Sequence, residues 1–228
     1  MLYTEEAVRA NIRNRDGKRI FFLAREDTLT PGARDFLHRE RIEIRDAREA
    51  KIEIYRLLSG GVLQEKPEHM THLNGDVLVS KQHPRIAFRG CMDILEADLL
   101  LCQLVLEEPY KKQAEEILSL ARHLIRCDVL DEPVPEESLC GLTQQQIRER
   151  SHRPQEYYGQ PHFMPQVSDG LAVLALNRCR CSARSAELAG VRAFADVEGN
   201  PTRTDILRAL NRISSMLYIL MIQRKRQT

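Results

Sequence analysis

The sequence lacks most of the signatures that would assign it quickly to a common class of protein. Its 228 residues contain no Gly-X-X-X-X-Gly-Lys phosphate loop, no Gly-X-Gly-X-X-Gly dinucleotide fingerprint and no Ser-His-Asp hydrolase signature. The 34 basic and 33 acidic residues leave a net charge of only +1, which does not favour binding to the nucleic-acid backbone. No apolar run reaches the roughly 18 residues that a membrane helix needs, and no secretory signal is recognisable. We therefore expect a cytoplasmic protein without a nucleic-acid or membrane partner.

Metal chemistry also has little support. The 6 cysteines form no Cys-X-X-Cys pair, and Cys179 and Cys181 point about 200° apart on a predicted helix, so they cannot face one ion. His69 and His72 lie close together and His83 follows, but no cysteine is near them. We interpret the cysteines as free thiols and the histidines as polar loop residues, and we expect no metal site.

The chain does contain a long series of predicted helices. Apolar residues recur at helical spacing in segments 85–106, 110–127, 168–194 and 201–223, with a shorter patch at 143–150. The proline-rich stretch 128–166 is long for a loop, which indicates that it covers something. We predict a mainly α protein with a four- or five-helix bundle over residues 67–228.

Residues 1–66 are predicted to form a small mixed α/β extension. Segments 18–24 and 41–45 have the pattern of short strands. Thr30 and Pro31 form a helix-start signal, and a second helix is predicted over 47–58, before Gly60-Gly61. No chemistry is evident in this extension, so we interpret it as structural or docking.

Three of the predicted bundle helices carry polar stripes. The stripes are Arg85, Arg89 and Asp93 on the first; Arg180, Arg184 and Glu187 on the fourth; and Asn211, Ser214, Ser215 and Tyr218 on the last. Taken singly, each stripe is more typical of a solvated or self-satisfied face than of a site. Two arginines one turn apart can nevertheless grip a polyphosphate, and polar groups on so apolar a last helix must find partners.

Three separated segments together resemble the ATP-dependent corrinoid adenosyltransferases, most closely their ethanolamine-utilisation branch. The first runs from Thr71-His72-Leu73 through Lys81 to Pro84-Arg85, Arg89-Gly90 and Asp93. The second is Arg180-X-X-X-Arg184-X-X-Glu187, similar to the family's arginine-rich helix, and the third is Leu210-Asn211-Arg212-Ile213-Ser214, similar to its Leu-Asn-Arg-Leu-Ser helix. Each motif alone is weak, whereas their order and spacing make the set specific.

The resemblance implies a homotrimer of helical bundles with active sites between subunits. ATP would there give its 5′-deoxyadenosyl group to the cobalt of a reduced corrinoid, cob(I)alamin, and yield adenosylcobalamin and triphosphate for ethanolamine ammonia-lyase. The resemblance also implies roles by position: Asp93 and Arg180 form an ion pair at the subunit interface, Arg184 holds the triphosphate, Asn211 and Glu187 bind the nucleotide, and Thr71 and Lys81 contact phosphate.

Further implications concern cofactors and partners. ATP is the co-substrate, cobalamin the substrate, and Mg²⁺ would assist the leaving polyphosphate. Partners that fit are ethanolamine ammonia-lyase, a corrinoid reductase and a bacterial microcompartment shell. An apolar pocket below the corrin would disfavour its lower ligand, and the candidates to line it are Phe88, Tyr157, Tyr158 and Phe163.

The sequence departs from the family in two places. Some ethanolamine-branch members carry a cysteine-rich metal cluster before the Thr-His-Leu element, but residues 59–67 here contain no cysteine. The glycine-rich nucleotide loop of the propanediol-type enzymes is also missing, so the backbone groups that hold the phosphates stay open. The alternative function is a non-catalytic helical module that binds ATP or a corrinoid, or that docks a partner of the ethanolamine system.

Overall fold

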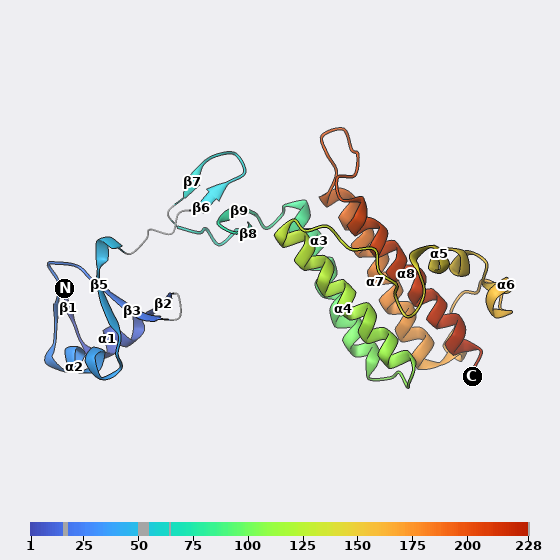
Figure 1. The fold of residues 1–228 in the computed structure, drawn as a ribbon, viewed down its shortest axis with the longest axis horizontal. Helices are drawn as coiled ribbons and strands as arrows, with labels where there is room; N and C mark the ends of the chain where they lie inside the picture. Colours follow the sequence, from blue (N-terminus) through green and yellow to red (C-terminus); the bar gives the residue numbers. More distant parts are fainter. Residues whose placement is uncertain (16–17, 50–54, 64, 228) are drawn as a thin grey trace. The chain divides into compact units, whose positions relative to one another are not determined.

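The computed structural model describes residues 1–15, 18–49, 55–63 and 65–227 (Figure 1). The chain divides into two compact units. The first comprises Met1–Tyr55 with Val62–Glu65, and the second comprises Arg56–Gly61 with Lys66–Thr228. Each unit has its own cluster of buried apolar side chains, so each has a core of its own.

The first unit is a small α/β module built around a central strand. Its elements are β1 (Leu2–Tyr3), α1 (Glu5–Ala10), β2 (Arg13–Arg15), β3 (Lys18–Leu23), β4 (Thr28–Leu29), α2 (Pro31–Arg39), β5 (Glu43–Asp46) and the 3-10 helix η1 (Ala47–Glu49). β3 lies between β2, its antiparallel partner, and β5, its parallel partner, while β1 pairs in parallel with β4. Val8 of α1 and Phe36 of α2 share a core with Phe21 of β3.

Most predictions for this unit agree with the structure, and one is wrong. β3 and β5 fall on the predicted strands, and Thr30 Oγ1 caps α2 by accepting a hydrogen bond from the Ala33 N–H at 3.3 Å. In place of the helix predicted over 47–58, the chain forms η1 and then β6 (Tyr55–Leu57), and residues 50–54 lie outside the described residues. Arg56 of β6 pairs in parallel with Val77, and a local pattern of apolar residues carries no information about so distant a partner.

The second unit begins with a small sheet that the sequence did not predict. β6, β9 (Val77–Ser80) and β8 (Met70–Asn74) lie in that order, and Gly75, with a φ of 49°, turns the β8–β9 hairpin. β7 (Val62–Leu63) belongs to the first unit. The hairpin pairs Thr71 with Val79, and Lys81 follows two residues later, so Thr71 and Lys81 lie on one face of it.

Four long helices form the rest of the second unit (Figure 1). They are α3 (Pro84–Gln103), α4 (Tyr110–Leu130), α7 (Gly170–Ala193) and α8 (Thr204–Lys225). α3 packs along α7, α7 along α8, and α4 beside α3. The connection from α4 to α7 carries α5 (Gln144–His152), which lies on α8, then α6 (Pro154–Tyr158) and the 3-10 helix η2 (Val167–Asp169). The predicted mainly α bundle with a small N-terminal α/β part is confirmed.

Helical spacing explains which side chains fill the bundle. Leu95 and Leu99 of α3 and Leu217 of α8 are completely buried, as the apolar pattern predicts. At Gly190 of α7 an added Cβ would lie 3.0 Å from Cδ2 of Leu207, so the glycine lets α7 and α8 approach closely. No helix within the described part of the chain is long and apolar enough to cross a membrane.

Candidate functional site

The polar stripes of α7 and α8 lie side by side. The Asn211 Nδ2 of α8 donates a hydrogen bond to the Glu187 Oε1 of α7 at 3.0 Å. On the same pair of helices, Arg180 and Arg184 face a hollow that the α8 stripe also lines. The structure therefore pairs Glu187 with Asn211 and places Arg180 and Arg184 together at the hollow, which Glu187 and Asn211 do not line.

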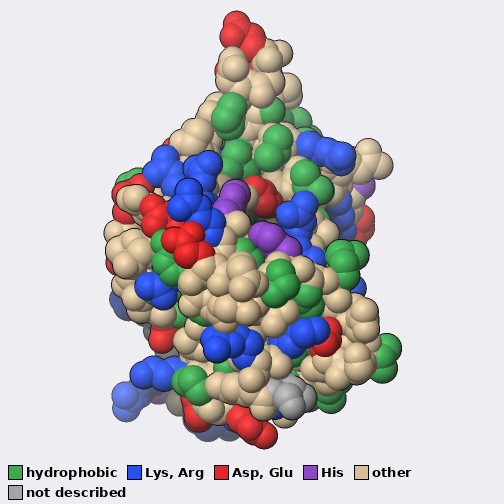
Figure 2. All heavy atoms as spheres, turned by 90° about the vertical axis from the view of Figure 1, so that its right-hand side faces the viewer, with side chains coloured by type: hydrophobic (Ala, Val, Ile, Leu, Met, Phe, Trp, Pro, Cys, Tyr) green, Lys and Arg blue, Asp and Glu red, His purple; other side chains and the backbone are tan. Residues whose placement is uncertain are grey.

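This hollow, which we call the α7–α8 hollow, has a volume of about 240 Å³. Its lining side chains come from α5, α7, α8 and the segment before α7: Ser151, His152, His162, Arg180, Arg184, Ser214, Ser215 and Tyr218. Figure 2 shows the face of the bundle that carries α5, where histidine side chains lie near the middle with Lys and Arg side chains around them. The sequence stripes contain five of these eight residues, whereas Ser151, His152 and His162 were not assigned to a site because only the fold brings them there.

The hollow is cationic and its cations are not neutralised. No carboxylate among the described residues lines it. Arg180 donates through Nε and Nη2 to the amide oxygen of Asn177, at 3.2 and 3.1 Å, and Arg184 has no partner among the described residues. An anionic ligand would therefore meet guanidinium groups that no other described group neutralises.

Tyr218 is fixed at one wall of the hollow. Its hydroxyl oxygen accepts a hydrogen bond from the Phe163 N–H at 3.2 Å and lies 3.1 Å from Nδ1 of His162. The His162 ring stacks on the Tyr218 ring with 5.7 Å between centroids, and Phe163 stacks on it at 6.0 Å. Because the oxygen already accepts from Phe163, the simplest arrangement has Tyr218 donating to His162.

The four aromatic candidates for a corrin pocket occupy different environments. Phe88 is completely buried and packs edge-on against Phe194 at 5.1 Å, so it belongs to the core and that candidate was wrong. Tyr158 is also buried, and Tyr157 is 42% exposed. Phe163 is half-buried beside Tyr218 and is the candidate nearest the α7–α8 hollow.

The charged residues of the α3 stripe do not share one environment. Arg85 and Arg89 turn toward α4, where Asp128 accepts hydrogen bonds from their Nε atoms at 2.8 and 2.7 Å. Asp93 is exposed and has no partner within the described chain. Arg85 and Arg89 are therefore neutralised by a buried carboxylate on another helix, whereas Asp93 is not paired within the described chain.

Thr71 and Lys81 share a face of the β8–β9 hairpin but do not line the α7–α8 hollow. The hairpin is tied to the start of α3, where Arg89 Nη2 donates to the carbonyl of Leu73 at 2.7 Å. Within one chain, then, Thr71 and Lys81 of the hairpin do not lie at the same site as Arg184 of α7, although the resemblance implies phosphate contacts for all three.

The histidines considered as metal ligands have other contacts. His83 Nδ1 accepts a hydrogen bond from the Arg85 N–H at 3.2 Å and so caps α3, while burial, then Arg85 and Arg89, lower the pKa of His83. His72 Nδ1 lies 3.0 Å from the carbonyl oxygen of Gly75. Over the described residues no group of three or more His, Cys, Asp or Glu side chains could hold a metal ion.

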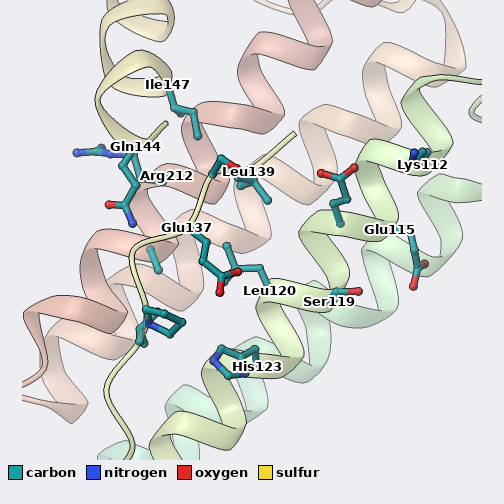
Figure 3. A pocket seen from close by; sticks show the side chains of 15 residues that line it. Lys112, Glu115, Ser119, Leu120, His123, Glu137, Leu139, Gln144, Ile147 and Arg212 are labelled. Carbon is teal, nitrogen blue, oxygen red and sulfur yellow. The ribbon is translucent and has the colours of Figure 1, made fainter. Parts of the chain in front are cut away.

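A second pocket, of about 460 Å³, lies under residues 131–143, which we call the strap (Figure 3). The strap is anchored by the Val134 N–H, which donates to Asp205 at 3.0 Å, and by the Cys140 N–H, which donates to Glu116 at 3.0 Å. Leu120, Leu139 and Ile147 form part of an apolar lining between α4, the strap and α5. No nominated site residue lines this pocket. The sequence indicated only that the proline-rich stretch covers something.

A helical bundle whose hollow is lined by two arginines, with no carboxylate from the described residues, has the charge that suits an anionic ligand. The cobalamin adenosyltransferase family model matches residues 62–223, and the chain belongs to this family. It is 31% identical to the corrinoid adenosyltransferase EutT of Salmonella typhimurium and 29% identical to that of Escherichia coli K12. Both alignments cover 96% of this chain and 90% of the relative. The resemblance drawn from the sequence motifs is confirmed, and the protein is a transferase.

Proposed function

We propose that the protein transfers the 5′-deoxyadenosyl group of ATP to the cobalt of a reduced corrinoid and releases triphosphate, in support of ethanolamine utilisation. The observation that carries the proposal is the family match over residues 62–223. Within this range Arg180 and Arg184 of α7 line one hollow, and Asn211 of α8 bonds to Glu187 of α7. The adenosylcobalamin formed would serve ethanolamine ammonia-lyase.

The reaction forms one bond and breaks one. The electron pair of cob(I)alamin attacks the C5′ carbon of the ribose, the bond from C5′ to the triphosphate oxygen breaks, and triphosphate leaves with the electrons of that bond. Because the cobalt is already a strong nucleophile, the tasks of the protein are orientation and stabilisation of the leaving group. Cationic donors that are already in place are suited to the negative charge that grows on the leaving oxygen.

We assign Arg184 to the triphosphate and Asn211 with Glu187 to the nucleotide. The guanidinium of Arg184 has no partner among the described residues, which supports its assignment to the triphosphate. Glu187 and Asn211 fix each other through their 3.0 Å hydrogen bond. Thr71 and Lys81 add phosphate contacts from the hairpin of a neighbouring subunit, and Mg²⁺ would enter with the phosphates of ATP.

We further propose a homotrimer in which Asp93 of one subunit pairs with Arg180 of the next. The support is an exposed apolar surface on α3 and α7: Ile94, Leu101 and Leu104 are 51, 64 and 80% exposed, and Leu188 is 64% exposed. Several large apolar side chains exposed on two adjacent helices are a feature of interaction surfaces. Asp93 lies one residue before Ile94 on the exposed side of α3, and its carboxylate is unpaired within the described chain.

The cellular setting is part of the same proposal. Residues 1–66 would form an extension separate from the adenosyltransferase domain of 67–228, and the separate core of the first unit supports this division. We place the protein in the cytoplasm, inside or attached to a bacterial microcompartment. The extension is then the candidate surface for the shell, a corrinoid reductase or ethanolamine ammonia-lyase.

The test is an anaerobic assay with ATP, Mg²⁺ and chemically reduced cobalamin. The absorption spectrum of adenosylcobalamin should appear together with inorganic triphosphate, and Arg184→Ala should abolish both. No product above the protein-free control would overturn the enzymatic proposal. ATP binding without turnover, unchanged in Arg184→Ala, would instead indicate a non-catalytic binding module.

A further inference from the structure

We propose that the α7–α8 hollow is a phosphate-binding subsite to which His152 of α5 and Ser214 of α8 contribute beside Arg184. The inference rests on the proposed function, and it goes further by giving a role to His152 and to Ser214, a residue of the third sequence motif to which the resemblance assigned no role. Its ligand chemistry is a phosphate group with several acceptor oxygens.

The first support is the balance of charge. Arg184 and His152 reach the hollow from two helices, and the described chain places no carboxylate in its lining. Arg180 also lines the hollow, but in the proposed trimer its charge is paired with Asp93 of the next subunit. The imidazole of His152 makes no hydrogen bond or ion pair with another described residue, although its backbone carbonyl lies 3.3 Å from Nε2 of His162. The imidazole is therefore available to a ligand, while the contact between the backbone carbonyl and His162 holds this end of α5 beside the hollow.

The second support is a hydroxyl at the hollow that has no hydrogen-bond partner among the described residues. Ser214 is only 7% exposed, lines the hollow and makes no hydrogen bond to another described residue. A serine on a helix commonly bonds back to a carbonyl one turn earlier, as Ser185 does to Cys181 at 3.1 Å. The Ser214 hydroxyl is not one of the enclosed side-chain atoms that lack a partner, so it is open to the hollow, where it can donate a hydrogen bond to an oxygen of a ligand held by Arg184.

The arrangement of donors favours phosphate over a carboxylate. The donors come from α5, α7 and α8, on several sides of one small volume. A carboxylate is planar and is commonly satisfied by one guanidinium fork, whereas a phosphate group presents three strong acceptor oxygens in different directions. Guanidinium, imidazole and hydroxyl donors around one hollow match the acceptor oxygens of a phosphate group.

Two substrates of the proposed reaction carry this chemistry. ATP has its triphosphate, and cobalamin has a phosphodiester in the nucleotide loop that bears its lower base. Cobinamide, a corrinoid without that loop, lacks the phosphodiester. Direct binding measurements can therefore identify which phosphate the hollow receives.

The experiment is calorimetric titration of the trimeric or native protein with inorganic triphosphate, and separately with cobalamin and cobinamide. We compare wild type with His152→Gln and Ser214→Ala, using His38→Gln as the matched control because His38 is an exposed histidine of the first unit. We expect each hollow variant to weaken one phosphate-bearing ligand about tenfold, since a charge-assisted hydrogen bond is lost, while His38→Gln changes nothing.

The pattern of affinities distinguishes the two phosphate-bearing ligands. Weaker triphosphate binding with unchanged corrinoid binding assigns the hollow to ATP. Weaker cobalamin binding with unchanged cobinamide binding assigns it to the phosphodiester. Wild-type affinities for all three ligands in both folded variants, judged by unchanged melting temperature, would overturn the proposal. The wild-type adenosylation assay tests the proposed function independently, so the two failures are distinguishable.

Discussion

The Nε of Arg89 on α3 lies 2.7 Å from Oδ2 of Asp128 on α4. Arg85 holds the other carboxylate oxygen through its Nε at 2.8 Å, and Asp128 is completely buried. A carboxylate can be buried in this way only when paired and hydrogen-bonded, because the desolvation of a lone charge is very costly. Since Arg89 also donates to the carbonyl of Leu73, this cluster joins the β8–β9 hairpin to both helices.

Replacing Asp128 by alanine should therefore destabilise the bundle strongly. Removal of one partner of a buried ion pair leaves the other charges uncompensated and typically costs about 3–5 kcal/mol. The free energy of unfolding in urea should fall by about this amount. Asp76→Ala is the matched control, because Asp76 is 47% exposed in its pair with Arg56 and an ion pair at the surface contributes little to stability. Equal, small effects of both substitutions would contradict the prediction.

The subunit interface can be tested with charge reversal. Asp93→Arg and Arg180→Asp should each weaken the proposed trimer and abolish activity, because each places like charges opposite one another. The double variant should recover part of the assembly, since the pair is restored with opposite polarity. Sedimentation velocity measures the oligomeric state. Glu96→Arg serves as the control, because Glu96 already pairs with Arg122 within the chain at 2.5 Å. A trimer unaffected by both single substitutions would exclude the pairing.

The bundle was predictable from the sequence because its determinants are local. The apolar spacing of α3, α4, α7 and α8 and the capping signals at Thr30 and Pro84 are read within a few residues. The hairpin and β6 were not predicted, because a strand such as Tyr55–Leu57 depends on a partner that lies far along the chain. The helix predicted at 47–58 failed for the same reason.

The candidate site was only partly predictable, because some of its residues also depend on partners that lie far along the chain. The stripes on α7 and α8 follow from helical spacing, and so does their meeting once two long helices are adjacent. His152 and His162 reach the hollow only because α5 lies on α8 and the following segment returns past Tyr218. On α3, one side of the helix contained three charged residues, but the sequence did not reveal that Asp128 would take two of them.

Phe163 is expected to disfavour the lower ligand of the corrin. Its ring is stacked on Tyr218, with Nζ of Lys225 4.5 Å from its centroid, so it is held in place from two sides. In Phe163→Ala, a smaller fraction of the bound cob(II)alamin should lack its lower base. The kcat should fall several-fold, while the KM for ATP stays near the wild-type value. Absorption spectra of the ternary complex with ATP measure the base-free fraction. Tyr157→Ala, at an exposed ring, should match wild type, and equal spectra for the two variants would count against Phe163.

The strap should be held by an acid-sensitive anchor at the start of α8. Burial would raise the pKa of Asp205, but hydrogen bonds from Arg203 and from the Val134 and Ile206 N–H groups outweigh it and lower the pKa from 3.8 to about 2. A carboxyl whose pKa is lower in the folded state stabilises the fold above its unfolded pKa, and this contribution disappears as the pH falls from 3.8 to 2.

Asp205→Asn should therefore reduce the free energy of unfolding by about 2 kcal/mol at neutral pH, with the difference shrinking progressively below pH of about 4. Urea unfolding of wild type and variant at several pH values between about 7 and 3 measures this convergence. Asp131→Asn is the control, because Asp131 also lies 3.5 Å from Arg203 but is 83% exposed, and its effect should be small at every pH. A difference for Asp205→Asn that stays constant with pH would show that the variant acts through packing, and that the charge of the carboxylate does not stabilise the anchor.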